Sequence, residues 1–172
     1  MNVFALHSNP KMAAVYHCDK HVVKMILESA QILSTVHQIS PGEHSEKIAS
    51  NLYRQTHQRH PCVLWALQSQ GNYDWLVQLS FALNAEFRYR YGKTVDHASV
   101  RVLNAVKSTY PSFGEVNPAL RPFALTMPAE ARLRGDGNHS IQEAVDSYRN
   151  YYRLEKRAIA QWTGRPKPHW WY

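Results

Sequence analysis

The sequence contains little cysteine and no long hydrophobic run. Two cysteines, Cys18 and Cys62, stand among 172 residues, which is too few for a disulfide scaffold. The segment from Met1 to His7 lacks the basic start and the long apolar run of a signal peptide. No stretch approaches the roughly 20 apolar residues that a membrane span requires. We therefore expect a soluble protein of a reducing cytoplasm, of bacterial or phage type, with no membrane partner.

The common nucleotide-binding and hydrolase motifs are absent as well. The sequence has no GxxxxGKS/T, no GxGxxG, no HExxH and no GxSxG. These absences argue against nucleotide hydrolysis by a phosphate-binding loop and against serine-hydrolase chemistry. We expect no cofactor.

Basic and aromatic residues are plentiful. Lysine and arginine number 20 against 13 acidic residues, giving a formal charge of +7, and aromatic residues make up 12% of the chain. The excess is shared, with +2 in residues 1–60, +2 in 61–108 and +3 in 109–172, so no basic tail stands apart. This composition is typical of nucleic-acid partners, because cations meet phosphates and flat rings stack on bases.

The periodicity of apolar residues predicts an all-α fold. No alternating strand pattern appears, and 44% hydrophobic residues suffice for a core, so we expect one domain, a bundle of about five to six helices over residues 1–172. Val3 to Leu6 is expected to be a buried extended lead-in. The predicted helices cover 10–38, 43–57, 61–71, 72–91, 96–108 and 140–162. Residues 109–139 form a long proline-rich loop, and 165–172 an irregular basic and aromatic tail.

A polar stripe follows the first predicted helix. His17, His21, Lys24, Glu28 and Gln31 are separated by steps of four, three, four and three, which places all five on one helical face. One interpretation is an ordinary exposed face with weak charge pairs. The other is a set of proton-transfer or anion-binding groups, because two histidines beside a lysine and a glutamate are suited to acid–base chemistry.

A second polar cluster precedes Pro61. It is either a basic helix end or a phosphate-binding and base-binding surface, formed by Arg54, His57, Arg59 and His60. Two segments, Cys18-x-x-His21 and His57-x-x-His60-x-Cys62, also contain zinc-ligand types, although no CxxC pair accompanies them. We interpret both cysteines as small buried residues and expect no metal. Alternating cations and tyrosines at 88–93 suggest either a helix end decorated with cations or a phosphate and stacking surface, with Arg88, Arg90, Tyr91 and Lys93 as contacts.

Three segments resemble the phage pyrimidine-dimer DNA glycosylases of the endonuclease V type. Ala13-Ala14-Val15-Tyr16-His17 is similar to the start of that family's first helix, and His17 matches its helix histidine. Asn72 to Gly92 is similar to the family's long helix, which ends in a basic, aromatic and glycine segment. Arg165-Pro166 with Trp170-Trp171-Tyr172 resembles the family's closing segment.

The resemblance implies a small basic all-α enzyme whose α-amine, freed by removal of the initiator methionine, forms a Schiff base at C1′ of the sugar. Here residue 2 is Asn, whose bulk disfavours that removal, so the nucleophile is either Met1 or Asn2. The family's glutamate position, seven residues beyond the histidine, holds Lys24, and Glu28 follows one turn later. A second hypothesis makes Lys24 the nucleophile, because neighbouring cations and partial burial would lower its pKa.

The sequence therefore predicts a DNA-acting enzyme, a glycosylase or glycosylase/lyase for a damaged or modified base. His17, His21, Lys24 and Glu28 would form the acid–base site. Beyond the two clusters above, the expected nucleic-acid contacts are Lys20, Arg121, Arg132, Arg134, Arg165, Lys167, Trp170 and Trp171. The alternatives are a non-catalytic nucleic-acid-binding protein and a zinc-dependent hydrolase using His17, His21, His57 and His60; RNA is also open as the target. Protonation of these histidines predicts stronger binding as the pH falls towards 6.

Overall fold

The computed structural model describes residues 1–114, 116–133 and 138–172. Within these ranges all regular structure is helical, with seven α-helices, three short 3-10 turns and no strand, so the all-α expectation is confirmed. The elements are α1 (Pro10–Tyr16), α2 (Asp19–Ile39), α3 (Ser45–Ile48), η1 (Ala49–Asn51), α4 (Pro61–Gln68), α5 (Gln70–Tyr91), α6 (Val100–Val106), η2 (Ala129–Ala131), α7 (Ile141–Glu155) and η3 (His169–Trp171).

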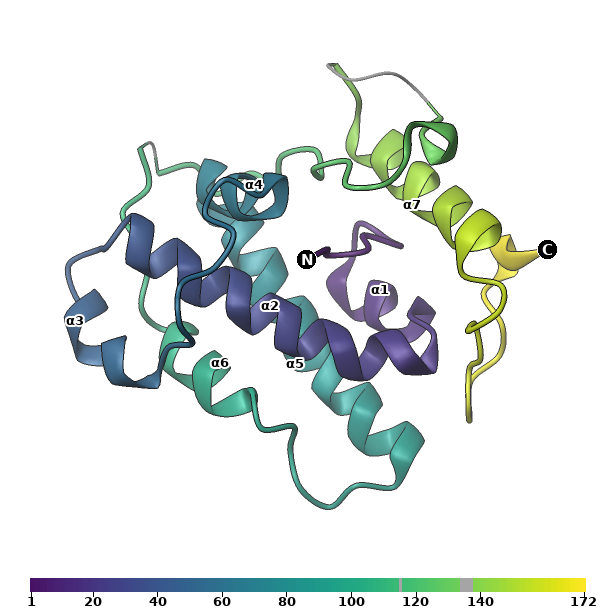
Figure 1. Cartoon of the computed structure of the whole chain (residues 1–172), viewed down its shortest axis with the longest axis horizontal. Helices are drawn as coiled ribbons and strands as arrows, with labels where there is room; N and C mark the ends of the chain where they lie inside the picture. The colour runs from purple at the N-terminus through teal and green to yellow at the C-terminus, as the bar shows by residue number, and fades with distance from the viewer. Residues whose placement is uncertain (115, 134–137) are drawn as a thin grey trace.

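The two longest helices, α2 and α5, cross at the centre of the molecule (Figure 1). Val22, Ile26 and Leu33 of α2 are fully buried, as are Leu76 and Leu79 of α5, in agreement with the predicted core faces. Helices α1, α4 and α6 pack beside this pair. Among the helices of the described ranges, none is long and apolar enough to cross a membrane.

The first predicted helix is two helices. Asn9 caps α1 as expected, with its side chain accepting hydrogen bonds from the backbone of Lys11 and Met12. The backbone of His17 then turns to ψ 138°, and α2 begins only at Asp19. The expectation of one continuous helix over 10–38 is therefore wrong. The cause is a distant contact, since Arg90 of α5 donates to the carbonyl oxygens of Val15 and His17 at 2.8 and 2.7 Å.

Several other boundaries also differ from the sequence prediction. The helix expected over 43–57 is reduced to α3 and η1, and residues 52–60 are irregular. Gly71, expected near a helix end, lies inside α5, where a side chain would overlap the carbonyl oxygen of Pro118. Gly92 does end α5, with the left-handed φ of +58° that favours glycine. The predicted capping box of Ser140 and Glu143 starts α7, which ends at Glu155, earlier than expected.

The lead-in and the tail both pack inside the molecule. Val3 to Leu6 is buried as predicted, although Phe4 departs from extended geometry with φ +41°. Trp170 and Trp171, predicted as nucleic-acid contacts, are 8% and 9% exposed, so they offer little surface for stacking on bases. Figure 1 shows the start of the chain beside the middle of α2, with α4 and α7 on either side.

Candidate functional site

The start of the chain contacts Glu28 at the middle of α2. The backbone N–H of Asn2 donates a hydrogen bond of 2.8 Å to Glu28 Oε2. Lys24 Nζ lies 3.3 Å from the other carboxylate oxygen, Oε1, and the Glu28 side chain is only 13% exposed. The structure thus brings together four of the predicted catalytic residues, Met1, Asn2, Lys24 and Glu28.

The Asn2 side chain fixes this arrangement. Its Oδ1 accepts from the backbone N–H groups of Val3 and Phe4 at 2.8 and 3.1 Å, and its Nδ2 donates to the carbonyl oxygen of Thr126 at 3.0 Å. Phe4 is held at a positive φ and stacks on the ring of His21, with 4.4 Å between ring centroids. Left-handed backbone at a bulky residue costs roughly 1–3 kcal/mol and is frequent at functional sites.

The segment before α4 borders the same place. Burial lowers the pKa of His60, and so does the positive charge at the start of the chain, whereas Glu28 opposes them. Burial raises the pKa of Cys62 to about 11, and its Sγ lies 3.6 Å from Thr126 Oγ1. Cys62 is therefore a protonated thiol at neutral pH and not a nucleophile.

Two hollows open along this segment. One of about 560 Å³ is lined by His57, Gln58, Arg59 and His60. The other, of about 470 Å³, is lined by Gln31, Tyr53, Arg54, Gln55 and Thr56. The whole predicted second cluster, Arg54 to His60, therefore lines open space, together with Gln31 of the predicted stripe. His57 has φ +48°, the second positive φ among the non-glycine residues described, and its Nδ1 lies 2.6 Å from Thr56 Oγ1.

Most of the described arginines have guanidinium groups that are bound within the protein. Among those that the structure describes, only three guanidinium groups have no hydrogen bond, ion pair or aromatic ring contact, those of Arg54, Arg59 and Arg121. All three are exposed. Arg54 and Arg59 line the two hollows, and Arg121 lies on the irregular segment that continues to Thr126. Free exposed guanidinium groups are available to phosphates, unlike those already bound within the protein.

The two stripe histidines are buried. His17 Nδ1 lies 2.7 Å from the carbonyl oxygen of Ala13, and His21 Nδ1 lies 2.6 Å from Tyr152 Oη. Burial lowers the pKa of His17 to about 4 and that of His21 to about 3. Both are therefore neutral at pH 6, and the expectation that their protonation adds binding charge is wrong. The partial burial expected of Lys24 is also wrong, since its side chain is 64% exposed.

Of the other residues predicted to contact nucleic acid, some are paired within the protein and others are exposed. Arg90 is fully buried, with Nη1 3.1 Å from Asp19 Oδ1 and Nε 2.8 Å from Glu86 Oε2. Arg165 Nη2 pairs with Glu86 Oε1 at 2.6 Å, and Arg88 Nη1 lies 3.4 Å from Asp96 Oδ1. Arg132 Nε donates to a backbone oxygen of its own loop. Arg134 lies outside the described residues, and the exposed remainder comprises Lys20, Tyr91, Lys93 and Lys167.

The geometry does not support the zinc hypothesis. Within the described ranges, no three histidine, cysteine, aspartate or glutamate side chains are placed to hold a metal ion. Cys18 and Cys62 are buried free thiols, as their interpretation as small buried residues predicts.

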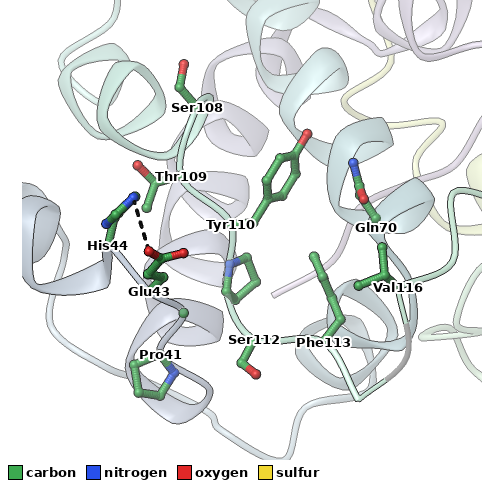
Figure 2. Close-up of a pocket in the computed structure, with 12 residues that line it drawn as sticks. Pro41, Glu43, His44, Gln70, Ser108, Thr109, Tyr110, Ser112, Phe113 and Val116 are labelled. Carbon is green, nitrogen blue, oxygen red and sulfur yellow. Dashed lines mark ion pairs between the residues drawn. The ribbon is translucent and has the colours of Figure 1, made fainter.

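Another hollow, of about 470 Å³, lies beyond the end of α2. Figure 2 shows the rings of Tyr110 and Phe113 and the exposed pair of Glu43 and His44 around it. No described lysine or arginine lines it. Its lining residues, 41–44, 70, 108–113 and 116, include none of the residues around Glu28, so it is separate from the candidate site.

Three residues of the site were not singled out from the sequence. Thr126 contacts Asn2 and Tyr152 contacts His21, and each of these contacts joins residues more than 100 positions apart in the sequence. Phe4 stacks on His21. No local motif signals such contacts. Comparison of this chain with protein-family models, curated proteins and solved structures finds no match.

Proposed function

We propose that this protein is a DNA glycosylase with associated lyase activity, acting on a damaged or modified base. The observation that carries the proposal is the 2.8 Å contact between the backbone nitrogen of Asn2 and Glu28 Oε2, which places the start of the chain on a shielded carboxylate. With Met1 in place this nitrogen is a peptide N–H, one residue from the α-amine of Met1, and removal of Met1 would make it the α-amine itself. Amine-dependent removal of a base requires an amine beside a carboxylate, since the nitrogen must lose a proton to attack.

The reaction needs a neutral amine at Glu28. Two nitrogens qualify, the α-amine at the start of the mature chain and Lys24 Nζ. As a class, α-amines have a pKa near 8 and lysine side chains one near 10.4, so α-amines supply more of the neutral form. The α-amine therefore takes the role of nucleophile. Lys24 Nζ, 3.3 Å from Glu28 Oε1, is then the counter-ion of the carboxylate.

In the proposed step Glu28 accepts a proton and later returns it. The amine nitrogen bonds to C1′ and loses a proton to Glu28, while the bond from C1′ to the base breaks and the base leaves with the electron pair and takes a proton from water. Glu28 returns its proton to the ring oxygen as the sugar opens, which leaves a protonated Schiff base. Removal of a proton from C2′ then expels the 3′ phosphate, and water hydrolyses the Schiff base and frees the amine.

In this proposal the DNA strand lies along the two hollows lined by residues 53–60. Arg54 and Arg59 have free guanidinium groups there, and phosphate contacts of this kind supply most of the affinity of nucleic-acid binding. Phe4 of the lead-in and His57 of the segment before α4 both have positive φ. Strained backbone held by surrounding contacts is consistent with a site built for geometry.

Borohydride trapping tests the proposal. Incubation with a duplex containing an abasic site, followed by reduction, is expected to give a covalent complex, and peptide mapping is expected to place the DNA on the first residue of the mature chain. Glu28→Gln should reduce trapping at least a hundredfold while DNA affinity is kept. Glu46→Gln, a change at an exposed glutamate of α3, should leave trapping unaltered. No complex with abasic DNA, or full trapping by Glu28→Gln, would contradict the proposal.

A non-catalytic nucleic-acid-binding protein is the second candidate, because the free guanidinium groups of Arg54 and Arg59 serve binding equally well. The same variant separates the two functions. In a pure binding protein Glu28→Gln removes a negative charge and raises affinity, and wild-type protein gives no trapped complex. In an enzyme, Glu28→Gln lowers turnover and leaves DNA affinity unchanged.

A further inference from the structure

An apolar groove lies between α1 and α5. It encloses about 560 Å³, and its floor and walls are formed by Val15 of α1 with Val77, Phe81, Ala82 and Ala85 of α5. None of the residues around Glu28 lines it. Apolar hollows of this size on a protein surface mark binding sites more often than chance, because exposed apolar surface is otherwise disfavoured.

Three apolar residues of α5 line the groove one helical turn apart. Val77, Phe81 and Ala85 follow one another at steps of four along α5, and eight residues of helix span about 12 Å. That length matches two turns of an incoming helix, whose apolar side chains at the same spacing form one face. A volume of 560 Å³ lies within the usual range for ligand sites of about 300–1,000 Å³.

Two lysines border the groove. Trp75 Nε1 donates to the carbonyl oxygen of Ser8 at 2.5 Å, which holds the start of α1, and with it Lys11, near the first part of α5. Tyr73 Oη donates to the carbonyl oxygen of Val106 at 3.0 Å, so Lys107 is held near the same part. Lys11 and Lys107 both line the groove.

These two charges are available to a ligand. Within the described residues, Lys11 Nζ has no ion pair or hydrogen bond, and Lys107 Nζ contacts only Asn104 Oδ1 at 3.2 Å. The acidic residue in the lining, Glu86, does not neutralise them. Although burial opposes it, hydrogen bonds from Arg165 and Arg90 lower the pKa of Glu86, and its charge is balanced by those two arginines.

We propose that this groove docks an acidic amphipathic helix of a partner protein, with two or three apolar side chains in the groove and carboxylates on Lys11 and Lys107. The charges of Lys11 and Lys107 favour an acidic partner over a second copy of this basic chain. A second copy of the chain would bring another pair of lysines and a charge of +7 against the same surface, which is repulsive. The proposal is independent of the function at Glu28, since the two places share no lining residue.

The test uses a fluorescein-labelled peptide with an acidic first turn and three leucines one helical turn apart. Two control peptides carry lysines for the acidic residues or serines for the leucines. Fluorescence anisotropy on the full chain is expected to show binding of the first peptide, at least tenfold weaker binding of the lysine peptide and none of the serine peptide. Added salt should weaken the binding, because the contact includes charge.

Variants of the protein locate the contact. The charge reversal Lys11→Glu with Lys107→Glu should weaken peptide binding at least tenfold, and Ala85→Arg, which fills the groove from an exposed position, should abolish it. Lys47→Glu with Lys93→Glu makes the same change of charge at exposed lysines elsewhere and should have no effect.

Four results would overturn the proposal: no peptide bound at millimolar concentration, equal binding of the acidic and lysine peptides, binding unaltered by Ala85→Arg, or a dimer in sedimentation that Ala85→Arg converts to a monomer. The last result would assign the groove to a second copy of the chain.

Discussion

Asn2 has two roles that its position in the sequence does not reveal. Its backbone nitrogen contacts Glu28, and its side chain makes three further hydrogen bonds with Val3, Phe4 and Thr126. The bulk that disfavours removal of Met1 is therefore the same side chain that directs the start of the chain to the carboxylate. A smaller residue would ease processing of the terminus and leave the lead-in unanchored.

Replacing Asn2 is expected to destabilise the protein. Asn2→Ala removes all three side-chain hydrogen bonds at a position only 8% exposed and leaves the Thr126 carbonyl unpaired, at a cost of about 1–3 kcal/mol in the free energy of unfolding. Urea denaturation followed by circular dichroism measures this. Asn51→Ala, at an exposed asparagine, is the control and should change stability by less than about 0.5 kcal/mol. Equal stability of the two variants would show that the side chain does not anchor the lead-in.

At the scale of elements, the junction of α1 and α2 is determined by Arg90. Its guanidinium donates to the last carbonyl groups of α1 and also pairs with Asp19 in the first turn of α2 and with Glu86 of its own helix. Asp19 accepts three further hydrogen bonds from Thr163, two from its backbone N–H and one from its hydroxyl, which ties the tail to the same junction. One buried cation thus joins α1, α2, α5 and the tail.

Replacing Arg90 should reduce the stability of the protein much more than replacing Arg88, its exposed neighbour. Arg90→Met leaves the carboxylates of Asp19 and Glu86, 12% and 7% exposed, without their common partner, and should reduce stability by about 3–5 kcal/mol. Arg88→Met removes a pair with Asp96 that is roughly half exposed and should cost less than about 1 kcal/mol. Thermal denaturation of the two variants measures the difference. Similar midpoints would mean that Arg90 does not hold the junction.

The junction of α1 and α2 also shows which helix ends can be predicted from the sequence. The ends of helices were predicted where the signal is local, as at the Asn9 cap, Gly92 and the Ser140 capping box. The break at His17 was missed because Arg90, which satisfies the free carbonyl groups there, is 73 residues away in sequence. The pairing of Glu28 with the start of the chain was suggested only through the resemblance to a glycosylase family. Composition and spacing identified the free arginines at 54 and 59 but did not distinguish them from the buried Arg90.

For the whole molecule, buried neutral histidines link stability to pH. His17, His21 and His37 are at most 6% exposed, and burial is the first cause that lowers the pKa of each, to about 4, 3 and 4. In the unfolded chain a histidine has its ordinary pKa of about 6.5. Between pH 6.5 and about 4 the unfolded state therefore binds more protons than the folded state, and the free energy of unfolding decreases as the pH falls.

The expected result is a protein that loses stability well above the acid range of its carboxylates. Each buried histidine contributes at most about 1.4 kcal/mol per pH unit below pH 6.5, so urea midpoints should be level from pH 8 to 7 and fall steeply from pH 6 to 4.5. His37→Gln can keep the contacts to Tyr73 and Ser45 with a side chain that does not titrate. This variant should reduce the slope of stability against pH by the contribution of one histidine. His44→Gln, at a half-exposed histidine, should leave the slope unchanged. A level profile down to pH 5 would mean that the histidines are protonated in the folded chain, which would restore the binding charge that their burial removes.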